Sequence, residues 1–228
     1  MLLDKSRFAV AAFLEEHFDT FWAEADALSM DDLVRWRDSD ACTKPWFCSP
    51  LFTDTPEAHT DIDFDYHRSL TPRSMELLEA HPKITMAGLS ILLYEGHIHS
   101  HVDVKEPGTV RAHLPLQVPN ESGIRLGGQL VRWTRGEAMV IEGGIDHEAA
   151  NLSMMPRIML LVDFTATAEE WAYIESEVAK VDPRWFVGGV GEGLFTNEEL
   201  ASGEWLTREL PADLPKDPEL VRELIAAR

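Results

Sequence analysis

The side chains with the clearest capacity for chemistry lie in the middle of this 228-residue chain. His101 and Asp103 are two residues apart, so on a β-strand their imidazole and carboxylate would point to the same face. His147, in the run IDHEAAN, can supply a second imidazole from another strand-like segment. Two histidines and one carboxylate on one face of an octahedral metal, with the other positions open, is the arrangement of non-haem Fe(II) oxygenases. These three residues are therefore candidate metal ligands and the candidate catalytic centre.

Spacing alone leaves other interpretations open. The chain has nine histidines, so His101 and His147 could be ordinary strand histidines held by hydrogen bonds. His97 and His99 precede them, and strict alternation would place all of these side chains with Asp103 on one face. A metal could accept only part of that row, so some histidines would lie behind the ligands or face a substrate.

If such an oxygenase uses a dicarboxylate co-substrate, the carboxylate far from the metal needs a fixed cation. Arginine can pair with a carboxylate at two points, which lysine cannot. Arg157 begins the apolar run RIMLLVDF, where an unpaired charge would be costly, although it could also be at the solvent end of a strand. Arg111 and His113 share a face in VRAHLPL, and Ser90 in GLSILLY could donate a hydroxyl hydrogen bond. These four residues are candidate co-substrate ligands.

The elements that position these residues are predicted to be short strands separated by Gly, Pro, Asn or charged turns. Their spacing is typical of a sandwich or a barrel, the class that includes jelly rolls, and it predicts a core over about residues 83–165. The strand-like segments are 83–94, 97–104, 109–118, 129–133, 138–142, 146–151 and 157–164.

Helical extensions are predicted on both sides, over residues 1–80 and 167–228. Before the core, apolar residues three and four apart form one stripe over 14–28, a short helix runs from Ser29 to Arg37, and Pro72 opens another. Residues 38–69 are predicted to be loop, with one strand at most. After the core, helix starts are predicted at Thr167, Thr196 and Asp217. With no repeat or linker, residues 1–228 are expected to form a single catalytic domain.

Taken together, residues 90–164 resemble the catalytic domain of the aspartyl/asparaginyl β-hydroxylases. That family's pattern is a serine, an iron histidine eleven positions later, R-x-H-L, a V/I-P turn, a G-E or G-K turn, H-E, and an arginine ten residues after the second histidine. The matching elements are Ser90, His101, Arg111-Ala112-His113-Leu114, Val118-Pro119, Gly136-Glu137, His147-Glu148 and Arg157. About a third of the chain is covered strongly.

The resemblance implies a mainly β fold, the double-stranded β-helix or cupin-like jelly roll of 2-oxoglutarate oxygenases, with flanking N- and C-terminal helices. It implies a dioxygenase that hydroxylates an unactivated carbon and releases succinate and CO2. The implied ligands are His101 and His147 for Fe(II), and Ser90, Arg111, His113 and Arg157 for 2-oxoglutarate, with Arg157 on its distal carboxylate.

Asp103 departs from the best-known animal members of that family, which have glycine there and bind iron with two histidines. Its carboxylate would complete the triad of metal ligands. It also argues against halogenation, which needs that coordination position for chloride. One residue is inserted between Asp103 and Arg111 relative to the animal pattern.

The composition indicates which classes of binding partner are disfavoured. The net charge of −20 disfavours nucleic acid, because phosphate binding needs clustered Lys and Arg. No run approaches the roughly 20 apolar residues of a membrane helix, and charges near the N-terminus interrupt any signal peptide. A cytoplasmic protein without membrane partners is expected, with Cys42 and Cys48 as reduced thiols.

The expected substrate is a small amino acid or amino-acid derivative, and the oligomeric state stays open. The candidates to bind a substrate carboxylate are Arg68, Arg73, Arg125 and Arg132. The alternatives are a non-catalytic cupin-like protein that binds a metal or a small molecule, and a cupin enzyme that uses no 2-oxoglutarate. Either would keep the three metal ligands but would not need Arg157.

Overall fold

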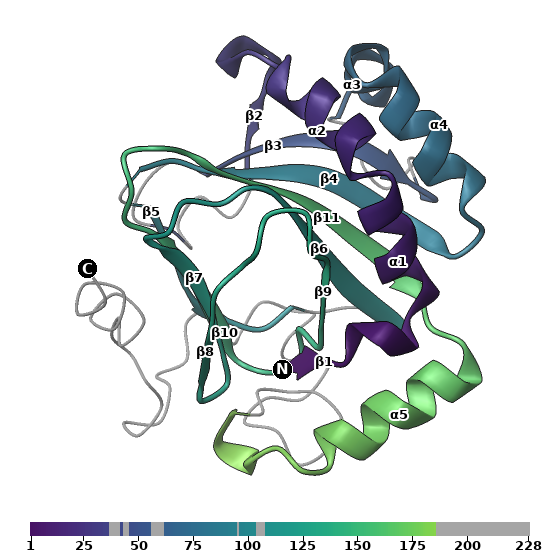
Figure 1. Ribbon diagram of the computed structural model, residues 1–228, viewed down its shortest axis with the longest axis vertical. Coiled ribbons are helices and arrows are strands. Elements are labelled where there is room, and N and C mark those ends of the chain that lie inside the picture. The colour runs from purple at the N-terminus through teal and green to yellow at the C-terminus, as the bar shows by residue number, and fades with distance from the viewer. Residues whose placement is uncertain (37–41, 43–45, 56–61, 95, 104–107, 186–228) are drawn as a thin grey trace.

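The computed structural model describes residues 1–36, 42, 46–55, 62–94, 96–103 and 108–185. Two antiparallel sheets face each other, and helices cover the outer face of the larger one (Figure 1). The strand order is β1-β9-β6-β11-β4-β3-β2 in the larger sheet and β5-β10-β7-β8 in the smaller.

The strands are β1 (Leu2–Leu3), β2 (Val34–Arg35), β3 (Trp46–Thr53), β4 (Ile84–Leu92), β5 (Gly96–His101), β6 (Thr109–Gln117), β7 (Ser122–Leu126), β8 (Gln129–Val131), β9 (Met139–Ile141), β10 (His147–Asn151) and β11 (Arg157–Thr165). The helices are η1 (Lys5–Arg7), α1 (Ala9–Glu16), α2 (Phe18–Asp26), η2 (Met30–Asp32), α3 (Phe64–Leu70), α4 (Pro72–Ala80), α5 (Ala168–Val178) and η5 (Pro183–Trp185).

The connectivity from β4 onward is that of a jelly roll. The chain passes from β4 in the larger sheet to β5 in the smaller, back to β6, across to β7 and β8, back to β9, across to β10 and finally to β11. Eight strands that wind through two sheets in this way form a double-stranded β-helix. The predicted mainly β jelly roll with flanking helices is therefore confirmed.

The alternation of side chains along β6 and β11 divides the apolar residues into two cores. Val110, Ala112 and Leu114 of β6 pack against the helices, as do the even-numbered residues of β11 from 158 to 164. Met159 and Leu161 of β11 face the smaller sheet instead. The odd-numbered polar residues of both strands therefore belong to the space between the sheets.

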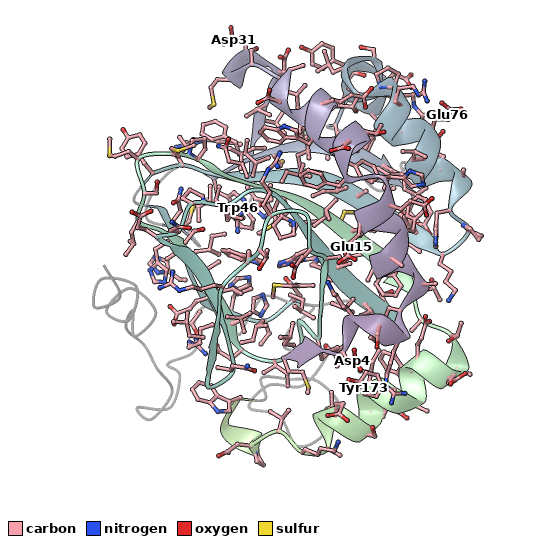
Figure 2. The ribbon with its side chains drawn as sticks, in the orientation of Figure 1. Asp4, Glu15, Asp31, Trp46, Glu76 and Tyr173 are labelled. Atoms are coloured by element: carbon pink, nitrogen blue, oxygen red, sulfur yellow. The ribbon has the colours of Figure 1, made fainter. Side chains whose placement is uncertain are left out.

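The predicted helix starts agree with the structure where it describes them. Pro72 occupies the first turn of α4. Thr167 and Glu170 cap α5 reciprocally, with the Thr167 amide 2.6 Å from a Glu170 carboxylate oxygen. Figure 2 shows Tyr173 of α5 beside Asp4, whose amide donates to the tyrosine hydroxyl over 3.0 Å. None of the described helices is long and apolar enough to cross a membrane.

The N-terminal 80 residues differ from the prediction, because they are not wholly helical. The stripe over 14–28 is split between α1 and α2, which meet at His17. Asp32 caps the amide of Ser29, but the chain then leaves the helix and pairs as β2 with β3. Strands β1 and β3 extend the larger sheet beyond the eight jelly-roll strands.

The structure also shows β7 and α3, which were not predicted. The helices predicted from Thr196 and Asp217 lie outside the described residues. The single domain over 1–228 consequently stays a prediction.

Candidate active site

The three predicted metal ligands come together at one end of the smaller sheet. His101 ends β5, His147 begins β10, and the two residues are direct partners in an antiparallel pair. Their ring centroids are 4.3 Å apart. Asp103 follows β5, and its Oδ2 lies 3.9 Å from Nε2 of His147. One ligand atom from each residue lies within 4.8 Å of the others, so a single ion could contact all three.

The imidazoles are oriented with one nitrogen available to a metal. Nδ1 of His101 lies 2.6 Å from the carbonyl oxygen of His99, and Nδ1 of His147 lies 2.9 Å from that of Ile145. A proton on each Nδ1 satisfies these contacts and leaves the lone pair on Nε2, as is usual for metal-bound histidines. Burial, helped by the nearby His101, lowers the pKa of His147 to about 3, which keeps this imidazole neutral. The donor set therefore fits a divalent ion.

The carboxylate of Asp103 is held from two sides. Its backbone amide donates to the carbonyl oxygen of Gly143 over 2.8 Å. A Cβ at Gly143 would lie 2.6 Å from Oδ2 of Asp103, so only glycine permits this close approach. On the other side, Nη1 of Arg111 donates to the same Oδ2 over 2.7 Å.

His97 and His99 do not share the face of the metal ligands, contrary to strict alternation. Ile98 between them packs into the core between the sheets, so both histidines point to the opposite face. A register shift in the pairing of β10 with β5, between His147 and Ala149, lets His101 return to the inner side. The alternation of side chains predicts the wrong face here because the register shift interrupts the regular pleat.

The outer face of the smaller sheet carries a buried ionic network behind the metal ligands. Arg125 of β7 donates to Glu148 and to Asp146, both over 2.6 Å, and these acids flank His147 in the chain. Nε2 of His97 lies 2.7 Å from Glu148. Although burial acts to raise the pKa of Glu148, hydrogen bonds from His97 and Arg125 lower it. The network ties together the three strands β5, β7 and β10.

Arg157 places a buried guanidinium between the sheets. Its Nη2 donates to Oγ of Ser90 over 2.7 Å, and Nε1 of Trp46 donates to the same hydroxyl over 2.8 Å. Figure 2 labels Trp46, which belongs to the core between the two sheets. None of the ion pairs found in the described part of the chain involves Arg157, and burial lowers the pKa of its guanidinium to about 10. A buried cation in this situation favours an anionic ligand.

Three buried polar atoms have no hydrogen-bond partner among the described residues. They are Nε of Arg157, Nε1 of Trp133 and Nδ1 of His113. The Arg157 guanidinium lies over the Trp133 ring, 5.3 Å from its centroid. Burial, together with the charges of Arg111 and Arg157, holds the pKa of His113 well below its usual range. A carboxylate-bearing ligand would satisfy such atoms, so the residues present fit 2-oxoglutarate.

Arg111 is placed differently from its predicted role. Its Nε and Nη2 bind the two carboxylate oxygens of Asp163, while Nη1 binds Asp103. Although burial acts to lower its pKa, the two carboxylates raise it. In the described structure Arg111 is thus a bridge between two acids, whereas Arg157 donates to Ser90 and His113 is buried with an unpaired Nδ1.

The four arginines considered for a substrate carboxylate are engaged elsewhere. Arg125 belongs to the outer network, and Arg68 pairs with Glu79. Arg73 lies 3.5 Å from Glu76, and Arg132 donates to a backbone carbonyl.

Sequence reasoning missed Trp133, Gly143 and Asp163. Asp163 carried a signal, since it stands two residues from Leu161 on the inner face of β11. Gly143 carried no signal in the sequence, because its importance depends on the contact with Asp103 in the folded chain.

Comparison with known proteins adds the family. The sequence profile of aspartyl/asparaginyl β-hydroxylase matches residues 15–167. An ornithine lipid ester-linked acyl 2-hydroxylase from Rhizobium tropici is 27% identical over 154 residues, which are 64% of this chain and 52% of that protein. The chain therefore spans about half the length of this curated relative.

Two solved structures match more weakly. A prolyl-4-hydroxylase from Pseudomonas putida has a TM-score of 0.42 and 14% identity, over 68% of this chain and 88% of that one. A predicted oxalate decarboxylase from Thermotoga maritima has a TM-score of 0.39 and 13% identity, over 59% and 92%. The fold assignment rests on the strand order rather than on these matches.

The predicted substrate needs correction. The Rhizobium relative is named for a lipid substrate, which points away from an amino acid, so the prediction of a small amino-acid substrate is wrong. It gave too much weight to the lack of a long apolar segment. An enzyme can bind an acyl chain in an apolar groove without crossing the membrane itself.

Proposed function

Because the chain belongs to the aspartyl/asparaginyl β-hydroxylase family, we propose that it is an Fe(II)- and 2-oxoglutarate-dependent hydroxylase that acts on an acyl chain of a lipid. The metal ligands in this proposal are His101, Asp103 and His147. The 2-oxoglutarate ligands are Ser90, His113 and Arg157.

The observation that carries the proposal is the buried guanidinium of Arg157, which lies over the Trp133 ring and donates to Ser90 between the two sheets. A protein that bound only a metal would gain nothing from a buried guanidinium that lacks a carboxylate partner in the described structure. Arg157 and Ser90 can hold the distal carboxylate of a dianion with charge-assisted hydrogen bonds. This feature favours a 2-oxoglutarate enzyme over a cupin-like binding protein.

Each part of the site then has a defined task. Bound Fe(II) and 2-oxoglutarate would together activate dioxygen, the oxidant that hydroxylation of an unactivated C–H bond requires. The two imidazoles and Asp103 fix the position of the metal, and Arg157 fixes the far end of the co-substrate. The apolar side chains between the sheets exclude water, which strengthens these ionic contacts.

Two features support an acyl substrate. Apolar side chains from both sheets line the space between them, including Leu126, Met139 and Ile141, and each buried methylene contributes about 0.8 kcal/mol. The buried inner cation Arg111 is already neutralised by two acids, which leaves Arg157 for the co-substrate. Among the described inner residues, a second anchor for an amino-acid carboxylate is therefore lacking. The name of the Rhizobium relative supports the carbon next to the acyl carbonyl as the target.

The test is an assay of purified protein with Fe(II), 2-oxoglutarate and lipid in mixed micelles. Ornithine lipid, phosphatidylethanolamine and free aspartate are supplied in parallel, and succinate and oxygenated acyl chains are measured by mass spectrometry. We expect succinate and a 2-hydroxyacyl product from a lipid, and loss of both in His101→Ala and Arg157→Met. Lipid-dependent turnover that survives both substitutions would refute the site, and turnover with aspartate alone would refute the lipid substrate.

A further inference from the structure

We propose that Asp163 is a positioning residue for the metal centre, which acts through Arg111 on the carboxylate of Asp103. The inference rests on the proposed function only in that these ligands hold a divalent metal. Asp163 is separated from the metal ligands by one side chain, so it would not touch the metal, the co-substrate or the reacting atoms.

The contacts form a continuous chain across three segments. Arg111 of β6 and Asp163 of β11 are direct partners in an antiparallel pair. Two parallel hydrogen bonds join them, Nε to Oδ1 over 2.7 Å and Nη2 to Oδ2 over 2.8 Å. This two-point pairing fixes the plane of the guanidinium. Its remaining arm, Nη1, then points at Oδ2 of Asp103 over 2.7 Å.

The orientation of Asp103 depends on this arm. Gly143 limits the carboxylate from one side, and Arg111 holds it from the other. The oxygen that Arg111 contacts is also the one 3.9 Å from Nε2 of His147, so it faces the place where a metal would bind. Without Asp163, the guanidinium would lose the two-point pairing that orients it, and the carboxylate of Asp103 would lose its fixed donor.

Burial strengthens these contacts. The three side chains are largely buried, with 16%, 14% and 10% exposure for Asp103, Arg111 and Asp163. Asparagine at position 163 would keep the side-chain shape but remove the carboxylate that pairs with Arg111. Loss of groups that orient metal ligands typically weakens binding by about 10–100-fold, and we expect a loss in this range.

The experiment measures Co(II) binding to the metal-free, full-length protein by titration, with the visible absorption spectrum of the bound ion as a second readout. The variants are Asp163→Asn, Asp163→Glu and Arg111→Lys. Glu170→Gln serves as the matched control, because it removes another buried carboxylate, one paired with Lys83 and capping α5. We expect Asp163→Asn to weaken Co(II) binding by about 10–100-fold and to alter the spectrum.

Asp163→Glu should recover part of the affinity, and Arg111→Lys should reproduce the loss, since lysine cannot bridge two carboxylates with a planar fork. Glu170→Gln should lower the melting temperature but leave Co(II) binding unchanged. If Asp163→Asn does not fold, Arg111→Lys decides by the same two readouts.

Unchanged Co(II) affinity in both Asp163→Asn and Arg111→Lys would overturn the inference. Weaker binding with an unaltered spectrum would also overturn it, because Asp163 would then act by charge alone. Wild-type protein that binds no Co(II) would instead refute the proposed function, so the two failures are distinguishable.

Discussion

Replacing Gly143 with alanine tests whether the fit around Asp103 determines metal binding. An added Cβ would lie 2.6 Å from Oδ2 of Asp103 and 3.0 Å from its Cβ. Ordinary van der Waals contact begins at 3.4 Å, so the carboxylate oxygen must retreat by about 0.8 Å. Metal–ligand distances tolerate a change of only about 0.2 Å. The alanine methyl group is therefore expected to displace the carboxylate from the position that a metal requires.

The expected result is a loss of about 10–100-fold in affinity for Co(II) or Mn(II), or about 1.4–2.8 kcal/mol. Isothermal titration calorimetry on metal-free protein measures this directly. Gly144→Ala is the matched control in the same turn, because its added Cβ would meet first the carboxylate end of the flexible Glu142 side chain, at 2.9 Å. Equal affinities for Gly143→Ala and wild type, or an equal loss in Gly144→Ala, would refute this reasoning.

Three further changes test other parts of the structure. Arg157→Met should abolish the quenching of tryptophan fluorescence by 2-oxoglutarate with Mn(II) under anaerobic conditions. It should not lower the melting temperature of the ligand-free protein, because the removed charge has no carboxylate partner among the described residues. A marked drop in that temperature would contradict this expectation. Arg125→Met should cost about 3–5 kcal/mol in urea unfolding, since it leaves Glu148 and Asp146 buried without their cation, and a cost below about 1 kcal/mol would show that the network is solvated. Burial lowers the pKa of His67 from its usual 6.5, so the unfolded state takes up the proton more readily and the free energy of unfolding falls as the pH drops below 6.5. His67→Gln should flatten part of that fall, and parallel pH curves for the two proteins would rule out this contribution.

The fold class was predictable because the strands of the core carry a strong local signal. Runs such as RIMLLVDF alternate between two buried faces, and the turns between them are marked by Gly, Pro and Asn. The caps of α4 and α5 were equally local, since Pro72 and the Thr167–Glu170 pair act within one turn. Features that depend on residues close in sequence were therefore within reach.

The missed features depend on contacts distant in sequence. Strand β3 is stabilised by its pairing with β4, from Trp46↔Leu92 to Thr53↔Met86, which the irregular stretch 38–69 does not reveal. The faces of His97 and His99 were misjudged because the register shift in β10 depends on tertiary pairing.

Within the candidate site, residue type and spacing predicted the group His101, Asp103 and His147, which the structure brings together, and their role as metal ligands stays a prediction, as does that of Ser90, His113 and Arg157. Residue type and spacing did not find the partners that hold Arg111. That arginine meets Asp163, 52 residues later in the chain, only because β6 and β11 are neighbours. Composition carried no information on the substrate, and the expectation of an amino acid failed for that reason.

The unpaired atoms around Arg157 imply that a bound anion would stabilise the folded protein. A buried donor without a partner costs about 1–3 kcal/mol, so the unliganded molecule is less stable than its fold would permit. An anion that satisfies Arg157, Trp133 and His113 would act as a folding ligand, and at a hundred times its dissociation constant it would add about 2.7 kcal/mol. Resistance to proteolysis should then rise with the supply of that carboxylic acid, so the same small molecule would govern both the activity of the catalyst and its survival.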